Sequence, residues 1–243
     1  MGVLSEKMAQ DLSIPRATQD AFAASSYQKA LRAQQLGHFD NEIIPLTVKW
    51  EDPKSGEVKD VVVTKDDGVR EGITVESLGR IKPAFAEKGS IHAGNASQIS
   101  DGASAVLLMK RSTAHSLSLP ILGAYISSTI TALPPLLMGL GPLHAIPKLL
   151  TKHNIPIDAI DVFEINEAFA SQCLYCIQEL GIPMEKVNPA GGAIAWGHPL
   201  GATGARQVGT LFGGLRRVGG RVGVTSMCVG TGMGMAALWV AEY

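Results

Sequence analysis

Residues 160–180, IDVFEINEAFASQCLYCIQEL, decide the fold because the hydrophobic pattern changes within them. The first six residues, IDVFEI, are rich in apolar side chains and have the length of a strand, and from Phe169 to Leu180 apolar side chains recur at helical spacing. Asn166 stands where one pattern gives way to the other. A strand that leads directly into an amphipathic helix is the building unit of α/β proteins.

The same alternation extends from residue 119 to the C-terminus. Residues 120–128, PILGAYISS, are apolar without a clean period of two, which is typical of a strand covered on both faces. The predicted order then continues with a helix at 142–153, a strand at 160–165, a helix at 167–180, a strand at 186–189, a helix at 202–219 and strands at 221–227 and 234–242. We therefore predict an α/β unit of βαβαβαββ order over residues 119–243.

The first 101 residues have a different texture. Helices are predicted at 5–12 and 15–37, then two strand-like runs at 41–52 and 57–66 joined by the turn sequence PKSG, and a short helix at 75–85. Residues 102–110, GASAVLLMK, resemble one further apolar strand.

Composition excludes several classes of function. Of 243 residues, 21 are Lys or Arg and 22 are Asp or Glu, so the net charge of -1 gives no electrostatic case for a nucleic acid as partner. No apolar run reaches the ~18 residues that a membrane span needs, and the sequence contains no recognisable targeting signal. Three cysteines are too few for a disulfide framework and indicate a reducing compartment.

Three polar residues stand at the ends of predicted strands. Asn166 follows the strand at 160–165, His198 lies in the loop GGAIAWGHPLGATG, and Cys228 precedes the glycines of SMCVGTGMG. Each has an ordinary alternative: Asn166 could be a helix N-cap, His198 a structural loop residue, and Cys228 a buried cysteine. Because ligands of open α/β sheets bind at the carboxyl ends of strands, the three together predict one site.

A CxxC sequence occurs at Cys173 and Cys176, a spacing that redox pairs and zinc sites use. Both residues lie within the predicted helix on the same face as Phe169 and Leu180, and no second CxxC exists. We interpret both cysteines as core packing.

NEAFASQ at 166–172, GGAIAWGHPLGATGARQ at 191–207 and SMCVGTGMG at 226–234 resemble, in this order and spacing, the motifs of the thiolase family. The resemblance covers the whole chain and is nearest to the peroxisomal type of 3-ketoacyl-CoA thiolase. It implies the layered αβαβα thiolase fold and the thiolytic cleavage of 3-ketoacyl-CoA in fatty acid β-oxidation. Within that fold, residues 1–101 would be a CoA-binding loop domain, 102–118 the last strand of an otherwise missing N-terminal domain, and 119–243 the C-terminal domain.

The resemblance implies a role for each residue of the site. His198 would deprotonate a nucleophilic cysteine, and Cys228 would move protons at the substrate α-carbon and at the CoA sulfur. Asn166, through a water molecule, and His198 would form one oxyanion site, and the amide of Gly230 would contribute to another. Phe169 would line the acyl pocket. The remaining residues would bind coenzyme A as a substrate, without a cofactor or metal: Arg70, Ser77, Phe85, Ala93 and Ser97.

The family further implies acyl-CoA and CoA as ligands, a homodimer for the full-length enzymes, and a peroxisomal location, with a mitochondrial or cytoplasmic one as the alternative. Two other functions stay open from the residues: a non-catalytic thiolase remnant that serves as a CoA-binding or interaction module, and a biosynthetic acetoacetyl-CoA thiolase. The intact GHP sequence and Cys228 argue against a lipid-transfer relative, which tends to lose them.

The sequence departs from the family pattern in one decisive respect. The family's nucleophile lies in a CSSG-like motif, and no such motif occurs here. We therefore expect residues 1–243 alone to be inactive and the segment 102–110 to lack sheet partners. Trp196 stands where the family has a small or aliphatic residue and could crowd the acyl pocket, and His92 stands where the family tends to have threonine.

Overall fold

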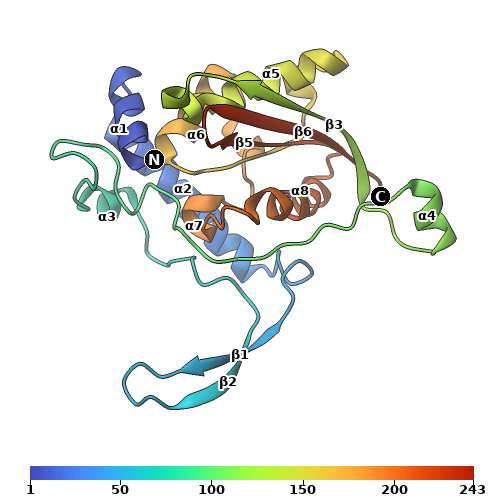
Figure 1. The fold of residues 1–243 in the computed structure, drawn as a ribbon, viewed down its shortest axis with the longest axis horizontal. Coiled ribbons are helices and arrows are strands. Elements are labelled where there is room, and N and C mark those ends of the chain that lie inside the picture. Colours follow the sequence, from blue (N-terminus) through green and yellow to red (C-terminus); the bar gives the residue numbers. More distant parts are fainter.

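The computed structural model describes residues 1–243 and is built around one four-stranded sheet (Figure 1). The strands lie in the order β3-β6-β5-β4, and only β4 and β5 are parallel. Their bounds are β3 Gly123–Ala132, β4 Val162–Ile165, β5 Val222–Val229 and β6 Met233–Ala241. The predicted α/β class is confirmed.

Helices cover both faces of this sheet. Helices α5 (Gly141–His153) and α6 (Ala170–Glu179) pack on one face, and α8 (Thr203–Val218) packs on the other (Figure 1). The side chains of β4 divide accordingly, because Val162 belongs to the core under α8 and Phe163 to the core under α5 and α6. Because both of its faces are covered, β4 shows no alternation of buried and exposed residues.

The strand predicted at 186–189 is wrong in extent. Only Val187 pairs with β4, through a single parallel bridge to Phe163. The next residue, Asn188, adopts a left-handed φ of 43°, so the strand does not continue. Its side chain makes the hydrogen bonds to β4 that the backbone of a longer strand would make. Its Oδ1 accepts from the amide of Ile165 at 2.9 Å, and its Nδ2 donates to the Ile165 carbonyl at 2.9 Å.

The strand predicted at 102–110, as part of the segment 102–118, is also wrong. Residues 101–109 make no backbone hydrogen bond and run as an extended chain past α8, followed by the short helix α4 (Arg111–Ser116) (Figure 1). Their apolar side chains are exposed, as the 78% exposure of Leu107 illustrates. A strand forms only where a neighbouring strand can pair with it, and none lies here.

The first 101 residues contain the predicted elements, except that the helix predicted at 75–85 ends at Gly79. Helices α1 (Gly2–Asp11) and α2 (Arg16–Gln35) lead into the hairpin of β1 (Leu46–Glu51) and β2 (Val58–Val63), and α3 (Val75–Gly79) follows. The hairpin extends away from the body (Figure 1). Helix α2 shares a core with Leu78, the start of α6 and the one-turn helix α7 (Ala193–Trp196).

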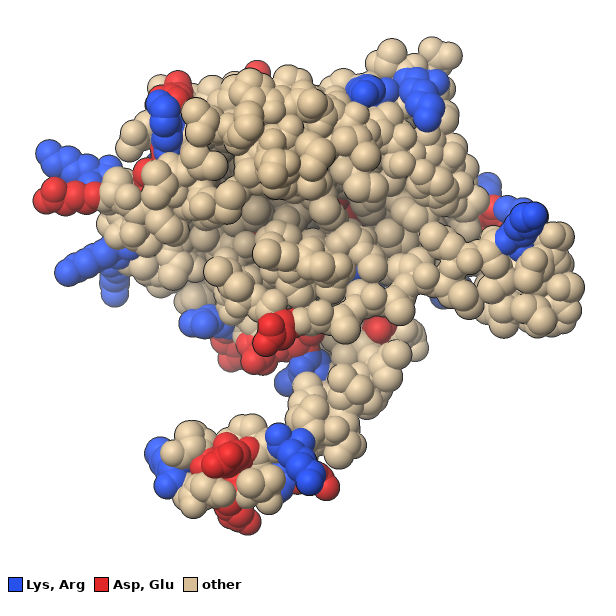
Figure 2. Space-filling model, in the orientation of Figure 1, with Lys and Arg blue, Asp and Glu red and all other residues tan.

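Short 3₁₀ turns complete the chain: η1 Pro135–Leu140, η2 Ile157–Ala159 and η3 Met184–Lys186. No helix combines the length and the apolar character needed to cross a bilayer. Charged side chains are concentrated on the hairpin and along the margins of the molecule, and the face of the body seen in Figure 2 is mostly uncharged.

Candidate active site

Asn166 and His198 meet at the carboxyl end of β4. Asn166 follows this strand, and its amide donates to the carbonyl of Ser226 on β5 at 2.9 Å. His198 lies between α7 and α8, and Nδ2 of Asn166 is 3.2 Å from its Nε2. The part of the prediction that joins Asn166 and His198 at one edge of the sheet is therefore confirmed.

The alternative of Asn166 as a helix N-cap is wrong. Helix α6 begins at Ala170, and its N-cap is Phe169, whose amide is 3.3 Å from Oε1 of Gln172. The Asn166 side chain is 1% exposed, and its Oδ1 has no hydrogen-bond partner. Because its Nδ2 is directed at His198, the Asn166 side chain contacts the His198 loop and does not cap the helix.

Two of the glycines near His198, Gly192 and Gly197, are required by close packing within the protein. A Cβ at Gly192 would clash with the carboxylate of Glu167, and one at Gly197 would clash with Oγ of Ser100. Gly197 also has a φ of 94°, which favours glycine. At these two positions the missing side chain makes room for neighbouring residues of the protein rather than for a ligand.

Glu167, which no sequence pattern singled out, holds three segments together. Its carboxylate accepts from Oγ of Ser26 at 2.6 Å, from Nδ2 of Asn188 at 2.7 Å and from the amide of Ile194 at 3.3 Å. Burial raises the pKa of Glu167, and these donors oppose that rise. The residue beside Asn166 is thus fixed to α2, to the turn at Asn188 and to α7. The only sequence signal was its place within NEAF.

The segment 92–98, which we call the strap, runs beside the Asn166 loop. The amide and the hydroxyl of Ser97 each donate to the carbonyl of Ala168 at 3.0 Å, and the amide of Ala170 donates to the carbonyl of Asn95 at 2.8 Å. The strap also reaches His198, whose amide donates to the carbonyl of Gln98 at 2.9 Å. Ser97 is therefore the predicted CoA residue that contacts the Asn166 loop directly.

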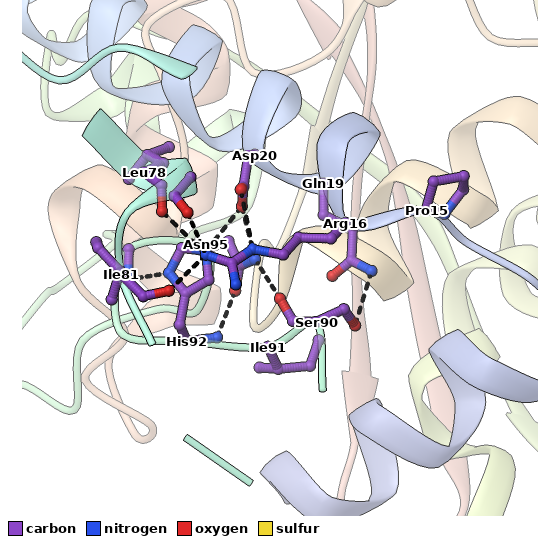
Figure 3. Close-up of polar contacts among 12 residues, drawn as sticks. Pro15, Arg16, Gln19, Asp20, Leu78, Ile81, Ser90, Ile91, His92 and Asn95 are labelled. Atoms are coloured by element: carbon purple, nitrogen blue, oxygen red, sulfur yellow. Dashed lines mark hydrogen bonds and ion pairs between the residues drawn. The ribbon is translucent and has the colours of Figure 1, made fainter. Parts of the chain in front are cut away.

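A buried polar network anchors the strap to α2 (Figure 3). His92 is fully buried, and its Nε2 lies 2.8 Å from Oδ1 of Asp20, which also accepts from Nδ2 of Asn95 at 3.0 Å. Arg16 contacts the other oxygen of Asp20 at 3.3 Å. Burial alone would raise the pKa of Asp20, but the hydrogen bonds from His92, Asn95 and Arg16 hold it below its usual value.

The electrostatic environment of His198 favours the neutral imidazole. Partial burial lowers its pKa, and the positive charge of Arg206 lowers it further. A neutral imidazole near pH 7 is able to accept a proton, as a general base must. This is the role that the family resemblance implies for His198.

Cys228 lies at the end of β5, two residues beyond Ser226. Its Cα is 3.1 Å from the position of a Cβ on Gly141, so the strand end packs directly on the start of α5. Burial raises the pKa of the Cys228 thiol to about 11. The thiol is consequently protonated near neutral pH, which suits an acid better than a nucleophile. Gly230, which follows in the turn between β5 and β6, is exposed.

The two cysteines of α6 are core residues. Cys173 and Cys176 are each 0% exposed and belong to apolar clusters. Burial raises the pKa of Cys176 to about 12 and raises that of Cys173 well above its usual value. Both thiols are therefore inert, and the interpretation of CLYC as core packing is confirmed.

The other predicted residues lie on several different elements. Phe169 is half-buried beside the strap, where it forms a bridge with Ala96. Ser77 forms a capping box with Thr74, the N-cap of α3: its hydroxyl accepts from the Thr74 amide and donates to the Thr74 carbonyl, both at 2.9 Å. Phe85 packs on Gly2 at the start of α1. Arg70 and Ala93 are exposed.

The indole of Trp196 packs against Phe39, in the segment that connects α2 to the β1–β2 hairpin. Its ring centroid lies 4.5 Å from that of Phe39, and its Nε1 donates to the carbonyl of Ala190 at 2.9 Å. The structure gives no support to the expected crowding of the acyl pocket by this residue. No group of three or more His, Cys, Asp or Glu side chains is arranged to hold a metal ion.

Comparison with known families decides the relationship of the chain. The model of the thiolase C-terminal domain matches residues 119–241, and the model of the thiolase N-terminal domain matches residues 1–112. This chain belongs to the thiolase family. Its α/β sheet, with Asn166 after β4 and Cys228 at the end of β5, is therefore that of a thiolase C-terminal domain.

Similar thiolases are longer than this chain. The peroxisomal 3-ketoacyl-CoA thiolase of Yarrowia lipolytica is 57% identical, and the match covers 100% of this chain and 58% of that relative. The peroxisomal 3-ketoacyl-CoA thiolase of Homo sapiens is 53% identical, and the match covers 98% of this chain and 56% of that relative. The crystal structure of the dimeric peroxisomal thiolase of Saccharomyces cerevisiae is 50% identical, with a TM-score of 0.89 over 100% of this chain and 59% of that one. The Bacillus anthracis acetyl-CoA acetyltransferase is 39% identical, with a TM-score of 0.94 over 100% and 60%.

Proposed function

We propose that the chain is the His198- and Cys228-bearing part of a 3-ketoacyl-CoA thiolase, an enzyme that uses CoA to cleave 3-ketoacyl-CoA into acetyl-CoA and a shortened acyl-CoA. The observation that carries this proposal is the 3.2 Å contact between Asn166 and a neutral His198 at the sheet edge of a thiolase-family chain. The Yarrowia lipolytica and human relatives, which are both 3-ketoacyl-CoA thiolases, support the substrate class.

His198 is assigned as the base of the first step. Its lowered pKa leaves the imidazole free to take the proton of a nucleophilic thiol. The sulfur of that thiol then forms a bond with the ketone carbon of the substrate. The bond between this carbon and the α-carbon breaks, and its electron pair becomes the enolate of the departing acetyl-CoA. Asn166 and His198 are proposed as oxyanion donors, Asn166 through a water molecule.

Cys228 is assigned as the acid. With a pKa of about 11 its thiol carries a proton at neutral pH and can give it to the enolate α-carbon. The Cys228 thiolate then takes the proton of an incoming CoA, whose sulfur displaces the enzyme sulfur from the acyl carbon. His198 returns its proton to the released enzyme thiolate, so every group ends in its starting state. The amide of Gly230 is assigned to the second oxyanion.

The nucleophilic thiol is proposed to lie outside residues 1–243. Cys173 and Cys176 are buried in the core, and Cys228 has the acid role. Since the chain matches only 58% of the Yarrowia lipolytica relative, a larger enzyme has room for this group. We assign Phe169 to the acyl pocket. We assign the binding of CoA, as a substrate with no other cofactor, to Arg70, Ser77, Phe85, Ala93 and Ser97.

The oligomeric state and the cellular location are proposed from those of the similar proteins. We propose that the complete enzyme is a homodimer, because the similar peroxisomal thiolase of Saccharomyces cerevisiae is dimeric. We propose a peroxisomal location because the Yarrowia lipolytica and human relatives are peroxisomal.

A chimera tests the proposed activity. Residues 1–243 would replace the matching part of the Yarrowia lipolytica thiolase, and CoA-dependent loss of a 3-ketoacyl-CoA would be followed. We expect turnover by the chimera, none by residues 1–243 alone, and a loss of at least ~10³-fold in the chimera on His198→Ala or Cys228→Ala. Robust turnover by residues 1–243 alone would overturn the assignment, because Cys228 or a helix cysteine would then have to be the nucleophile.

A further inference from the structure

Thr203 lies directly behind the imidazole of His198. It is the first residue of α8 and is fully buried. Its hydroxyl oxygen is 2.7 Å from Nδ1 of His198 and 2.9 Å from the carbonyl oxygen of Pro199. None of the roles assigned above includes this hydroxyl.

The hydroxyl has only one proton to give, and its two neighbours differ in what they accept. The Pro199 carbonyl can only accept, so the 2.9 Å contact uses the Thr203 proton. Nδ1 of His198 must then donate to the Thr203 oxygen. If the Thr203 proton pointed instead to Nδ1, two oxygens with only lone pairs between them would face each other at 2.9 Å.

The opposite side of the ring agrees with this assignment. When Nδ1 carries the hydrogen of a neutral imidazole, Nε2 carries the lone pair. Asn166 presents its Nδ2, a donor, to Nε2 at 3.2 Å, and its Oδ1 stays unpartnered. Both ring nitrogens therefore have complementary partners in only one tautomer of the neutral ring.

We propose that Thr203 is a positioning residue that fixes the Nδ1–H tautomer of His198 and so places the lone pair of the ring on Nε2, where Asn166 donates to it. The catalytic meaning of this tautomer rests on the proposed function, in which the Nε2 lone pair removes the thiol proton. Once Nε2 is protonated, its hydrogen is the one that His198 can offer to the oxyanion of the proposed function, because the Nδ1 hydrogen is held by Thr203.

The other buried histidine near the site provides an internal comparison. Nδ1 of His92 accepts from the amide of Gly94 at 3.1 Å, and its Nε2 faces Oδ1 of Asp20 at 2.8 Å. The same reasoning assigns the Nε2–H arrangement to His92, with its lone pair on Nδ1. The two histidines are thus expected to hold opposite ring nitrogens protonated.

Nitrogen-15 NMR of the ring nitrogens in the 243-residue chain tests the assignment near neutral pH. His198→Gln identifies the His198 signals. We expect Nδ1 of His198 in the range of an N–H nitrogen and Nε2 in the range of a lone-pair nitrogen, and the reverse pattern for His92. A wild-type His198 with Nε2–H would overturn the proposal without any need for a variant.

Four variants test the role of the hydroxyl itself. Thr203→Val keeps the shape and removes the hydroxyl, and Thr203→Ala does so with a better helix former, so at least one of them is expected to fold. Both should move the two His198 nitrogen shifts toward each other or invert them. Thr203→Ser should keep the wild-type pattern. Thr210→Val removes another α8 hydroxyl, bonded to Glu42 at 2.8 Å, and should also keep it.

The outcomes separate this inference from the proposed function. Unchanged His198 shifts in folded Thr203→Val and Thr203→Ala would overturn the role of Thr203. A confirmed Nδ1–H tautomer together with an inactive chimera would refute the proposed thiolysis and leave the role of Thr203 standing. In an active chimera, Thr203→Val should lower kcat more than it raises KM, and Thr203→Ser should restore kcat.

Discussion

The strap at 92–98 and the extended segment at 101–109 are near neighbours in the chain, yet they are held very differently. The strap exchanges backbone hydrogen bonds with Ala168, Ala170 and His198, and its anchor on Asp20 is buried. The segment 101–109 makes no backbone hydrogen bond, and its Leu107 is 78% exposed. The segment 101–109 has the more strand-like sequence, but it is the strap that forms backbone hydrogen bonds with other segments. The availability of a partner outweighs local propensity here.

The largest effect on stability is expected where the strap is anchored. Asp20→Ala should lower the free energy of unfolding by about 3 kcal/mol or more, because it leaves the buried ring of His92 without its partner. Urea denaturation measures the change. Asp11→Ala is a matched control, since Asp11 also pairs with a basic residue four positions away but is 52% exposed, and it should cost no more than about 0.5 kcal/mol. Equal losses in the two variants would contradict the special role of the anchor.

A pH-dependent effect is expected at Glu164, two residues before Asn166. The residue is 1% exposed, one of its carboxylate oxygens has no partner, and burial raises its pKa to about 8. The unfolded chain loses this proton near pH 4.5, whereas the folded chain keeps it until about pH 8. The unfolded state therefore binds fewer protons between these values, and stability falls as the pH rises, by at most ~1.4 kcal/mol per pH unit.

Glu164→Gln removes this contribution. The free energy of unfolding of the variant, relative to the wild type, should increase steadily from about pH 5 to about pH 8 in urea titrations. Parallel pH curves for the two proteins would show that Glu164 is ionised in the fold, held by Arg206, which lies 3.4 Å away.

A smaller loss of stability is expected at Gly197, where the His198 loop packs on Ser100. Gly197→Ala should cost about 1–3 kcal/mol, because Gly197 has a φ of 94° and a Cβ would clash with Oγ of Ser100. Gly201→Ala, in the same loop with no atom within 4 Å of the added Cβ and no left-handed φ, is the control and should be near neutral. A loss equal to that of Gly201→Ala would mean that the loop adjusts freely.

The sequence was sufficient for the α/β class, the hairpin and the place of Asn166, because hydrophobic periodicity and strand ends are local signals. It failed at 186–189, where the side chain of Asn188 replaces a strand. It failed at 102–110, where the pattern is right and the neighbouring strand is absent. In one case a side chain makes the hydrogen bonds that a neighbouring strand would make, and in the other no neighbouring strand is present. The local hydrophobic pattern of a segment contains neither fact.

The candidate site likewise contains residues that the sequence identified and residues that only the structure revealed. The motifs identified Asn166 and His198, whose contact the structure confirms. The residues that hold them, Glu167, Asp20 and Thr203, act through partners that are 141, 72 and 5 positions away in sequence. No spacing rule joins the first two to their partners. The contact of Thr203 is local, but its meaning depends on which atom carries one proton.

The smallest effect is expected in the segment that the fold does not hold. Leu107→Asp replaces an exposed apolar side chain, so no buried contact is lost and the free energy of unfolding should change by less than about 0.5 kcal/mol. The same change should raise the concentration at which the chain stays monodisperse in light scattering, because exposed apolar side chains favour association. The matched core variant Leu211→Asp, at a residue of α8 that is 0% exposed, should prevent folding. A cooperative loss of stability on Leu107→Asp would show that residues 101–109 pack on the sheet in solution, and the contrast with the strap would fail.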